Sequence, residues 1–290
     1  MLFDRLYAIG AIRKMLWRHW YPLLTWHLQR EKVTFLNYAY ETSPPLALTL
    51  SPADESNRGG IQLYHHVASS VDLKDKTVLE ISCGHGGGAS YLTRTRQPRS
   101  YTGVDLNPNG IRFCRKHHRI EGLTFRQADA ERLPFEADSF DVIINIESSH
   151  CYADFPRFIS EVARVLRPGG HFLYADFRDL ESVADWEQAL AASSLRKLHF
   201  EDISAKVVRG MDLNSAQSMA LVRRKLPSKF HRLAGDFAGV AGSRMYESLK
   251  AGTLFYRSGC FVKEPAPKAI RLRELIPLSV QTIGVAIAAL

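Results

Sequence analysis

The stretch that most constrains the fold runs from residue 77 to residue 90 and reads TVLEISCGHGGGAS. It begins as a short, largely apolar run, and four glycines follow within positions 84–88. Glycine lacks a Cβ atom, so a backbone rich in glycine can turn sharply and lie against a ligand. The helix expected next presents unpaired N–H groups in its first turn. Such a turn after a parallel strand is typical of nucleotide-like ligand sites in open α/β sheets, although the loop alone does not identify the ligand.

Apolar runs alternate with helical patterns after this loop. Besides the strand Thr77–Ile81, strands are expected at Ser100–Asp105, Leu123–Gln127, Phe140–Ile146, His171–Ala175, Leu198–Ile203 and Thr253–Val262. The run 140–146 is nearly continuous in apolar residues, as expected for a strand that is covered on both faces. Strands that alternate with helices predict an α/β fold with a doubly wound, mostly parallel sheet, here of seven strands.

Two acidic residues stand at strand ends beside the glycine-rich loop. Asp105 ends the second expected strand, 21 positions after Gly84, and Asp129 follows the third strand. In sheets of this type an acid at the first of these places accepts hydrogen bonds from ribose hydroxyls. An acid at the second place can accept a hydrogen bond from an exocyclic amine. An isolated aspartate at a strand end is more often a cap, but the loop and the two acids in this order predict a nucleoside site.

The ordered motifs VLEISCGHG, GVDLN, DA, FDV and LRPGG resemble those of class I S-adenosylmethionine-dependent methyltransferases. The resemblance implies a Rossmann-like fold and S-adenosylmethionine as cofactor. Asp105 would bind the ribose, and Asp129 with Ala130 would meet the adenine. The residues that it implies for cofactor binding are Glu80, Ser82, Cys83, Gly84, Gly86, Asp105, Leu106, Asp129, Ala130 and Asn145. Ser82 departs from the family, which has a glycine there.

More narrowly, residues 17–263 resemble the mycobacterial phthiotriol/phenolphthiotriol dimycocerosates methyltransferases. The matching stretches include WYPL at 20–23, SCGHGGGASYLTRT at 82–95 and SHCY at 149–152. This resemblance implies O-methylation of a hydroxyl on a long-chain lipid, which gives a methoxy group, and a large apolar lipid as substrate. Fatty-acid O-methyltransferases of glycopeptidolipid assembly are close relatives, so a glycopeptidolipid acyl chain or a sugar hydroxyl stays open as the acceptor.

The segment after the fourth expected strand holds the candidate catalytic residues. His150 lies at the carboxyl end of that strand, and a histidine of near-neutral pKa suits the removal of a hydroxyl proton. Related sugar O-methyltransferases have a similar histidine, assisted by an acid after the fifth strand, and Asp176 is the matching acid here. It would orient His150 and stabilise the imidazolium. Glu147 is the rival partner, and a packing role for His150 is the structural alternative.

Composition limits the partners of the chain. The 290 residues carry a formal net charge of +8, but the basic residues are scattered and no nucleic-acid-binding motif is visible, so no nucleic-acid partner is expected. The four cysteines include no CxxC pair, which disfavours a structural zinc site and a disulfide framework and fits a cytoplasmic protein. No carboxylate cluster suggests a metal. A basic surface also favours anionic membranes.

The expected organisation has three parts. Residues 1–60 form a helical, aromatic-rich extension and linker, 61–263 the methyltransferase domain with a helical cap insertion at 180–252, and 264–290 a tail. The aromatic residues of 1–30 either pack on the domain, which their helical spacing favours slightly, or touch a membrane as an amphipathic segment. A non-catalytic, cofactor-binding protein that docks on membranes is the alternative of another class, and the intact cofactor motifs argue against it.

Overall fold

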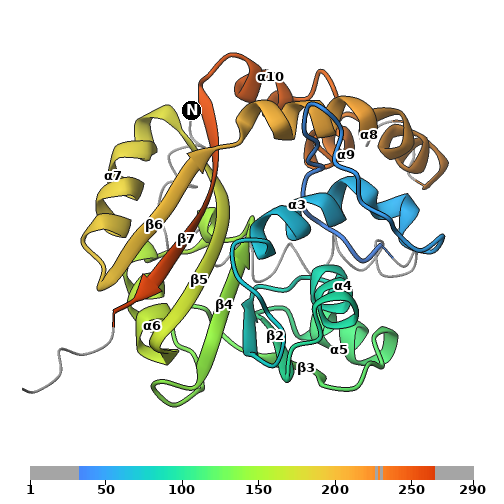
Figure 1. Ribbon diagram of the computed structural model, residues 1–290. Coiled ribbons are helices and arrows are strands. Elements are labelled where there is room, and N and C mark those ends of the chain that lie inside the picture. The colour runs from blue at the N-terminus through green and yellow to red at the C-terminus, as the bar shows by residue number, and fades with distance from the viewer. Residues whose placement is uncertain (1–32, 226–227, 229–230, 265–290) are drawn as a thin grey trace, which may run out of the picture.

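The computed structural model describes residues 33–225, 228 and 231–264, and a seven-stranded sheet crosses its centre (Figure 1). The strand order is β3-β2-β1-β4-β5-β7-β6. The strands are β1 (Thr77–Ile81), β2 (Ser100–Asp105), β3 (Leu123–Gln127), β4 (Phe140–Ile146), β5 (Leu166–Asp179), β6 (Leu195–Asp202) and β7 (Leu254–Lys263). The first five strands are parallel, and β7 runs antiparallel to both β5 and β6. The predicted doubly wound, mostly parallel sheet is therefore confirmed.

Helices cover both faces of the sheet. The helices α3 (Arg58–Ala68), α4 (Gly87–Arg96) and α5 (Pro108–His117) pack on one face, and α6 (Phe155–Val165) and α7 (Leu180–Ala191) pack on the other. Between β6 and β7 the chain forms α8 (Ser204–Lys225), α9 (His231–Phe237) and α10 (Arg244–Lys250), which lie together at the top of Figure 1. The chain thus winds outward from β1 in both directions, which leaves a crevice at the carboxyl ends of β1 and β4.

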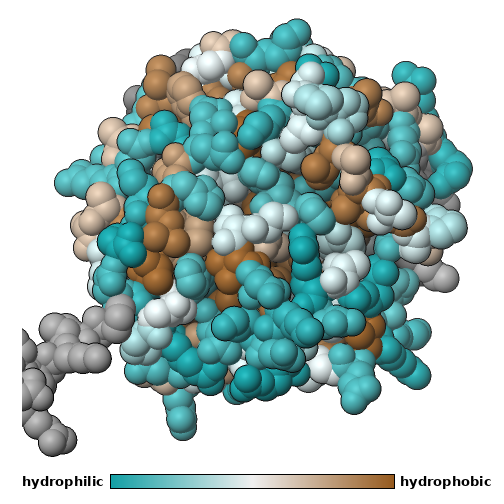
Figure 2. Space-filling view, viewed as in Figure 1, coloured by the Kyte–Doolittle hydropathy of each residue, from teal (hydrophilic) through white to brown (hydrophobic). Residues whose placement is uncertain are grey.

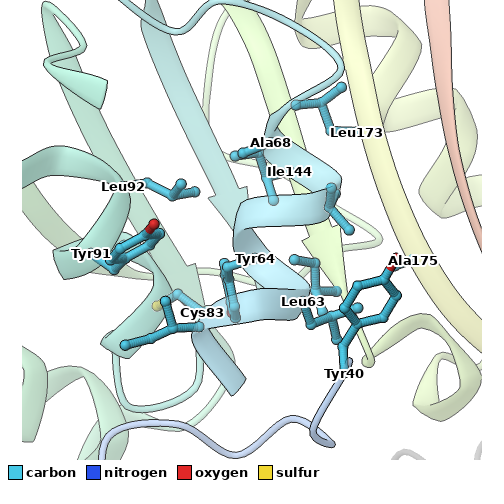
Figure 3. Packing of buried hydrophobic residues seen from close by; sticks show 14 of the residues in the cluster. Tyr40, Leu63, Tyr64, Ala68, Cys83, Tyr91, Leu92, Ile144, Leu173 and Ala175 are labelled. Carbon is cyan, nitrogen blue, oxygen red and sulfur yellow. The ribbon is translucent and has the colours of Figure 1, made fainter. Parts of the chain in front are cut away.

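Strand pleating explains the two hydrophobic clusters of the core. Successive side chains of a strand point to opposite faces, so Val78 and Ile144 join the cluster under α3 and α4, whereas Leu79 and Ile143 join the cluster under α6 and α7. Figure 3 shows the first cluster, in which side chains of α3 lie between α4 and the central strands. Strands covered on both faces need the continuous apolar sequences seen in β1 and β4.

The first four expected strands have the bounds that the structure gives them, and three others differ. β5 begins at Leu166 and ends at Asp179, well beyond the expected 171–175. Its first residue, Leu166, pairs with Phe140 of β4, and its antiparallel partner β7 pairs with it as far as Asp179. β6 spans 195–202 instead of 198–203. Of the proposed cap insertion 180–252, α7 and β6 belong to the sheet and its helical layer, and α8–α10 remain as the candidate cap.

The region before α3 differs from a simple linker. Residues 42–54 form an irregular, mostly exposed segment, but Ala39, Tyr40 and Glu41 are buried against the domain. The helix expected from Ile61 begins at Arg58. The aromatic segment 1–30 and the tail 265–290 lie outside the described residues. On the face that Figure 2 shows, hydrophobic residues form several separate groups among hydrophilic ones.

Candidate functional site

A cavity of about 370 Å³ lies at the carboxyl ends of β1, β2 and β4. Its volume falls in the range of about 300–1,000 Å³ that is usual for small-molecule sites. Nine of the residues singled out in the sequence line it: Ser82, Cys83, Gly84, Asp105, Leu106, Asp129, Ala130, Glu147 and His150. Four others, Glu80, Gly86, Asn145 and Asp176, do not line it. The sheet topology thus gathers residues from four separate stretches of chain around one space.

The glycine-rich loop turns in the left-handed region of backbone space. Gly86, the residue before α4, has φ of +76°, a conformation that glycine adopts without steric cost. Ser82 has φ of +59° although it carries a side chain. Its hydroxyl oxygen lies 2.7 Å from the phenol oxygen of Tyr152, so the serine that replaces a family glycine forms a hydrogen bond at the edge of the cavity.

The two strand-end acids line the cavity together with residues of the loop. The carboxylate of Asp105 accepts hydrogen bonds from the backbone N–H groups of Gly84 and Asn107, at 2.9 and 2.8 Å. Burial raises the pKa of Asp105 to about 6, although these two hydrogen bonds lower it. Asp129 accepts a hydrogen bond from the backbone N–H of Glu131 at 3.0 Å. Each acid thus accepts a hydrogen bond from the backbone and also lines the cavity.

Three predicted residues support the loop from behind the cavity lining. Both carboxylate oxygens of Glu80 accept hydrogen bonds from phenols, Oε1 from Tyr64 at 2.7 Å and Oε2 from Tyr101 at 2.8 Å. The side-chain amide of Asn145 donates to the carbonyl of Ile81 at 2.9 Å. Gly86 directly precedes α4. Glu80 acts on the loop through Tyr64, whose ring packs against Gly88. None of the three residues lines the cavity.

His150 and Asp176 form a hydrogen-bonded pair beside the cavity. Asp176 has no exposed side-chain surface, and its Oδ1 lies 2.7 Å from Nδ1 of His150. A carboxylate accepts only, so Nδ1 of His150 carries the proton and Nε2 is left as the second ring nitrogen of a side chain that is 21% exposed. Burial lowers the pKa of His150, but Cys151 and Asp176 raise it by more, to about 10. Burial acts to raise the pKa of Asp176, but His150 and Arg178 outweigh it and hold that pKa below the usual range.

Glu147, the rival partner, is bonded elsewhere. The backbone N–H of Tyr38 donates to both of its carboxylate oxygens at 3.0 Å, and the phenol of Tyr256 donates to Oε1 at 2.7 Å. Burial raises the pKa of Glu147 to about 8, despite these hydrogen bonds. Glu147 therefore lines the cavity while it holds the segment before α3 in place.

Sequence reasoning missed that segment, which we call the strap and define as residues 33–38. Its residues 34–38 line the cavity. The carbonyl of Val33 lies 2.7 Å from Nδ1 of His85, and the backbone N–H of Gly87 donates to the carbonyl of Thr34 at 3.2 Å. The sequence signal is faint, since only the closely spaced Phe35, Leu36 and Tyr38 set the strap apart from a polar linker. His85, for which the sequence favoured no role, is buried beneath the strap.

Comparisons with known proteins agree with this geometry. Residues 79–174 match the family model described as a methyltransferase domain. The chain is 54% identical over 252 residues, 87% of its length and 93% of the relative's, to the phthiotriol/phenolphthiotriol dimycocerosates methyltransferase of Mycobacterium tuberculosis. It is 49% identical over 245 residues, 84% of its length and 88% of the relative's, to the fatty-acid O-methyltransferase of Mycolicibacterium smegmatis. The chain belongs to the phthiotriol/phenolphthiotriol dimycocerosates methyltransferase family. It is an S-adenosylmethionine-dependent methyltransferase.

A solved structure shows the same fold in a distant protein. A putative sarcosine dimethylglycine methyltransferase from Galdieria sulphuraria superposes with a TM-score of 0.66 at 15% sequence identity, over 82% of this chain and 97% of that one. At this identity the likeness concerns the fold alone. It supports the seven-stranded architecture of this methyltransferase.

The cavity of this methyltransferase fits S-adenosylmethionine, which carries a sulfonium cation and a ribose. The lining includes the carboxyl groups of Asp105, Asp129, Glu131 and Glu147, and among the described residues it includes no lysine or arginine. A buried carboxylate such as Asp105 is a suitable acceptor for a pair of ribose hydroxyls. Acidic groups also favour a cation through their charge.

Two further observations concern the described part of the chain only. Within it, no helix combines the length and the apolar character that a membrane crossing requires. Nor do its histidine, cysteine, aspartate and glutamate side chains assemble into a group of three or more that could hold a metal ion.

Proposed function

We propose that this methyltransferase transfers the methyl group of S-adenosylmethionine to a hydroxyl of a long-chain lipid of the phthiotriol/phenolphthiotriol dimycocerosates type, giving a methoxy group. The observation that carries the proposal is the 54% identity over 93% of the tuberculosis enzyme, which is named for these acceptors. The match covers 87% of this chain.

The chemistry rests on the His150–Asp176 pair. When bound, S-adenosylmethionine supplies an electrophilic methyl group on a positively charged sulfur. The acceptor hydroxyl would give its proton to Nε2 of His150 as its oxygen takes the methyl group, and the sulfur–methyl bond would break to leave S-adenosylhomocysteine. Asp176 accepts from Nδ1, which fixes the ring and offsets the charge of the imidazolium. General base catalysis of this kind is worth about 10²- to 10⁴-fold in rate, and positioning of the two reactants contributes as well.

Residues around the glycine-rich loop are proposed to hold the cofactor. Asp105 would accept from the ribose hydroxyls, Asp129 with Ala130 would meet the adenine, and the loop from Ser82 to Gly86 would surround the methionine portion. Glu80 and Asn145 would act by supporting that loop, because hydrogen bonds to neighbouring residues engage their side chains. Glu147 would anchor the strap over the bound molecules.

The acceptor is tested with purified protein, S-adenosylmethionine and a panel of three lipids: a phthiotriol-type diol, a glycopeptidolipid with a hydroxylated acyl chain, and a glycolipid with a free sugar hydroxyl. Mass spectrometry should detect one added methylene group in the phthiotriol-type product. An Asp105→Ala variant, which should lose cofactor affinity, is the matched control. Methylation of another lipid in preference to the diol would contradict the proposed acceptor.

The fatty-acyl hydroxyl is the second candidate acceptor, and the 49% identity to the fatty-acid O-methyltransferase favours it. The same panel separates the two. A non-catalytic protein is the remaining alternative, and calorimetry with S-adenosylhomocysteine tests it together with the panel. Cofactor binding without methylation of any lipid would favour that alternative.

We further propose that the enzyme works in the cytoplasm at the surface of the inner membrane. A cavity of about 370 Å³ cannot enclose the whole of a long-chain lipid, so most of the acceptor stays outside it. All four cysteines are free thiols, as expected in a reducing compartment. Flotation with vesicles of anionic phospholipid should carry the protein upward, and its absence from the floated fraction would contradict peripheral binding.

A further inference from the structure

The ring of His150 contacts Oδ1 of Asp176, and the other carboxylate oxygen, Oδ2, accepts a hydrogen bond from the backbone N–H of His150 at 3.1 Å and lies beside a second charged residue, Arg178. The two residues are two positions apart on β5, so both side chains point to the same face of the sheet. Nη1 of Arg178 lies 3.5 Å from Oδ2 of Asp176. The guanidinium side chain is only 12% exposed. A buried cation is costly unless it is paired, so its place here calls for a partner of opposite charge.

Ser149 links the arginine to the acid. Nη2 of Arg178 donates to the hydroxyl oxygen of Ser149 at 2.9 Å, and that hydroxyl donates to Oδ2 of Asp176 at 2.5 Å. Tyr174 lies two positions before Asp176 on the same face of β5, and its phenol oxygen is 2.5 Å from the same hydroxyl. Every group in this network has a partner of the right kind, which favours one fixed arrangement.

Two aromatic rings, those of Phe155 and Trp186, contact the guanidinium group of Arg178 and fix its position. The guanidinium carbon of Arg178 lies 5.3 Å from the ring centre of Phe155 on α6 and 4.9 Å from that of Trp186 on α7. Both separations are within the range of cation–π attraction. The indole N–H of Trp186 also donates to the phenol of Tyr174 at 3.0 Å. Two helices and one strand therefore fix the position of one charge behind Asp176.

Resting on the proposed role of the His150–Asp176 pair, we propose that Arg178, through Ser149, is a positioning residue that holds Asp176 and offsets its charge, so that His150 reaches its unprotonated, proton-accepting form at a lower pH than it would beside Asp176 alone. Without the arginine, the full charge of Asp176 would act on His150 alone and favour the imidazolium, which cannot accept a proton. A nearby charge of this kind commonly shifts a titration midpoint by about 1–3 units.

Variants at position 178 leave the other titratable groups around the His150–Asp176 pair in place. They are Glu147 at the end of β4, Cys151 next to His150, and the phenols of Tyr38, Tyr174 and Tyr256. Burial raises the pKa of each of these phenols, so the phenols stay neutral over the working range. The difference between variants at position 178 then reports on the arginine.

The test follows the ring protons of His150 by NMR as a function of pH, in the full chain saturated with S-adenosylhomocysteine. Arg178→Gln should raise the titration midpoint of the His150 ring by about one pH unit or more. Arg178→Lys keeps the charge and should leave that midpoint within a few tenths of a pH unit of the wild-type value. Arg164→Gln removes a hydrogen-bonded arginine from α6 and serves as the control that leaves the midpoint unchanged. An unmoved midpoint in a folded, cofactor-binding Arg178→Gln protein would overturn the proposal.

If Arg178→Gln does not fold, Ser149→Ala tests the proposed role of Arg178 instead. This small substitution removes one donor from Asp176 and the link to Arg178, so a smaller upward shift of the midpoint supports the proposal and no shift overturns it. The NMR measurement needs no acceptor lipid. A failure of the proposed methyl transfer would appear as absent product in the lipid assay, whereas a failure of this inference appears as an unmoved midpoint.

Discussion

At the scale of single residues, His150 is the group on which the proposed chemistry depends most. Its side chain lines the cavity, and its ring stacks on that of Phe177 with centroids 4.2 Å apart, which fixes the plane of the ring. His150→Ala should lower turnover by about 10²-fold or more, the usual scale for a lost general base. Cofactor affinity should be retained, because the predicted cofactor contacts lie on the loop and at the strand ends.

Calorimetry with S-adenosylhomocysteine and steady-state methylation kinetics check both parts of this prediction. His118→Ala is a suitable control, since His118 is bonded to the loop through the carbonyl of His85 at 2.8 Å but does not line the cavity. Turnover that is unchanged in His150→Ala would remove this residue from the mechanism.

The pH dependence of turnover follows from the same residue. A base accepts a proton only in its unprotonated form, and the pKa of His150 is raised to about 10 because Cys151 and Asp176 outweigh the opposite effect of burial. Turnover should therefore rise with pH from neutral into the alkaline range. Asp176→Asn removes the carboxylate that favours the imidazolium, so the midpoint of the rise should move to lower pH while the plateau falls. Kinetics at saturating substrate over a pH series test this, and a midpoint that stays in place in the variant would contradict it.

The functional residues at strand ends could be predicted from the sequence, whereas the hydrogen-bond partners of the site residues could not. Asp105 ends β2, and Asp129 and His150 follow β3 and β4 by two and four residues, so local sequence is enough to bring them to one edge of a parallel sheet. The bonds of Glu80 to two tyrosines and of Glu147 to the strap join residues that are 16 to 109 positions apart. A pattern in one stretch of sequence carries no information about such distant partners.

At the scale of elements, the strap is the feature that sequence periodicity could not reveal. It has neither helix nor strand, and its position depends on hydrogen bonds to the loop, to Glu147 and to α3, where the side-chain amide of Asn37 donates to the carbonyl of Gly60 at 3.1 Å. The sheet was predictable because burial imposes a pattern on each strand. The extension of β5 was not, because the antiparallel partner β7 comes 75 or more residues later in the chain.

The strap should become more mobile when its hydrogen bonds to Glu147, which follows β4, are removed. Above pH 8 Glu147 is ionised, because its pKa is about 8. Glu147→Ala then removes the acceptor of the Tyr38 N–H, and a lost hydrogen bond to a charged group costs about 1.5–3 kcal/mol. Hydrogen exchange of the Tyr38 amide should then become faster by about tenfold or more, since 1.4 kcal/mol corresponds to a factor of ten. Tyr256→Phe is the matched control, because it removes the phenol that bonds Glu147 but leaves the Tyr38 contact intact. Equal protection of this amide in Glu147→Ala and in the wild type would show that other contacts hold the strap.

At the scale of the whole molecule, the cavity lies between parts of the chain with different tasks. The loop and the strand ends supply the predicted cofactor residues, the segment after β4 supplies the candidate base, and β5 supplies its acid. The strap and α10 contribute further residues to the cavity lining. α10 contributes Met245, a half-buried side chain that belongs to no cofactor motif. A long acceptor that enters along α10 would pass Met245 on the way to His150.

Met245 therefore offers a way to separate acceptor binding from cofactor binding. Met245→Glu places a carboxylate at the wall of the cavity, and an alkyl chain cannot solvate a charge. The KM for the lipid should rise on the order of tenfold. The affinity for S-adenosylhomocysteine should stay close to that of the wild type, since the predicted cofactor contacts lie on the loop and at the strand ends. Leu213→Glu adds the same charge to α8 at a side chain that is 69% exposed and does not line the cavity, so it should change neither value. If KM for the lipid rises equally in the two variants, the added charge acts at the membrane surface instead of in the cavity. If KM is unchanged in Met245→Glu, the acceptor enters on another side of the strap.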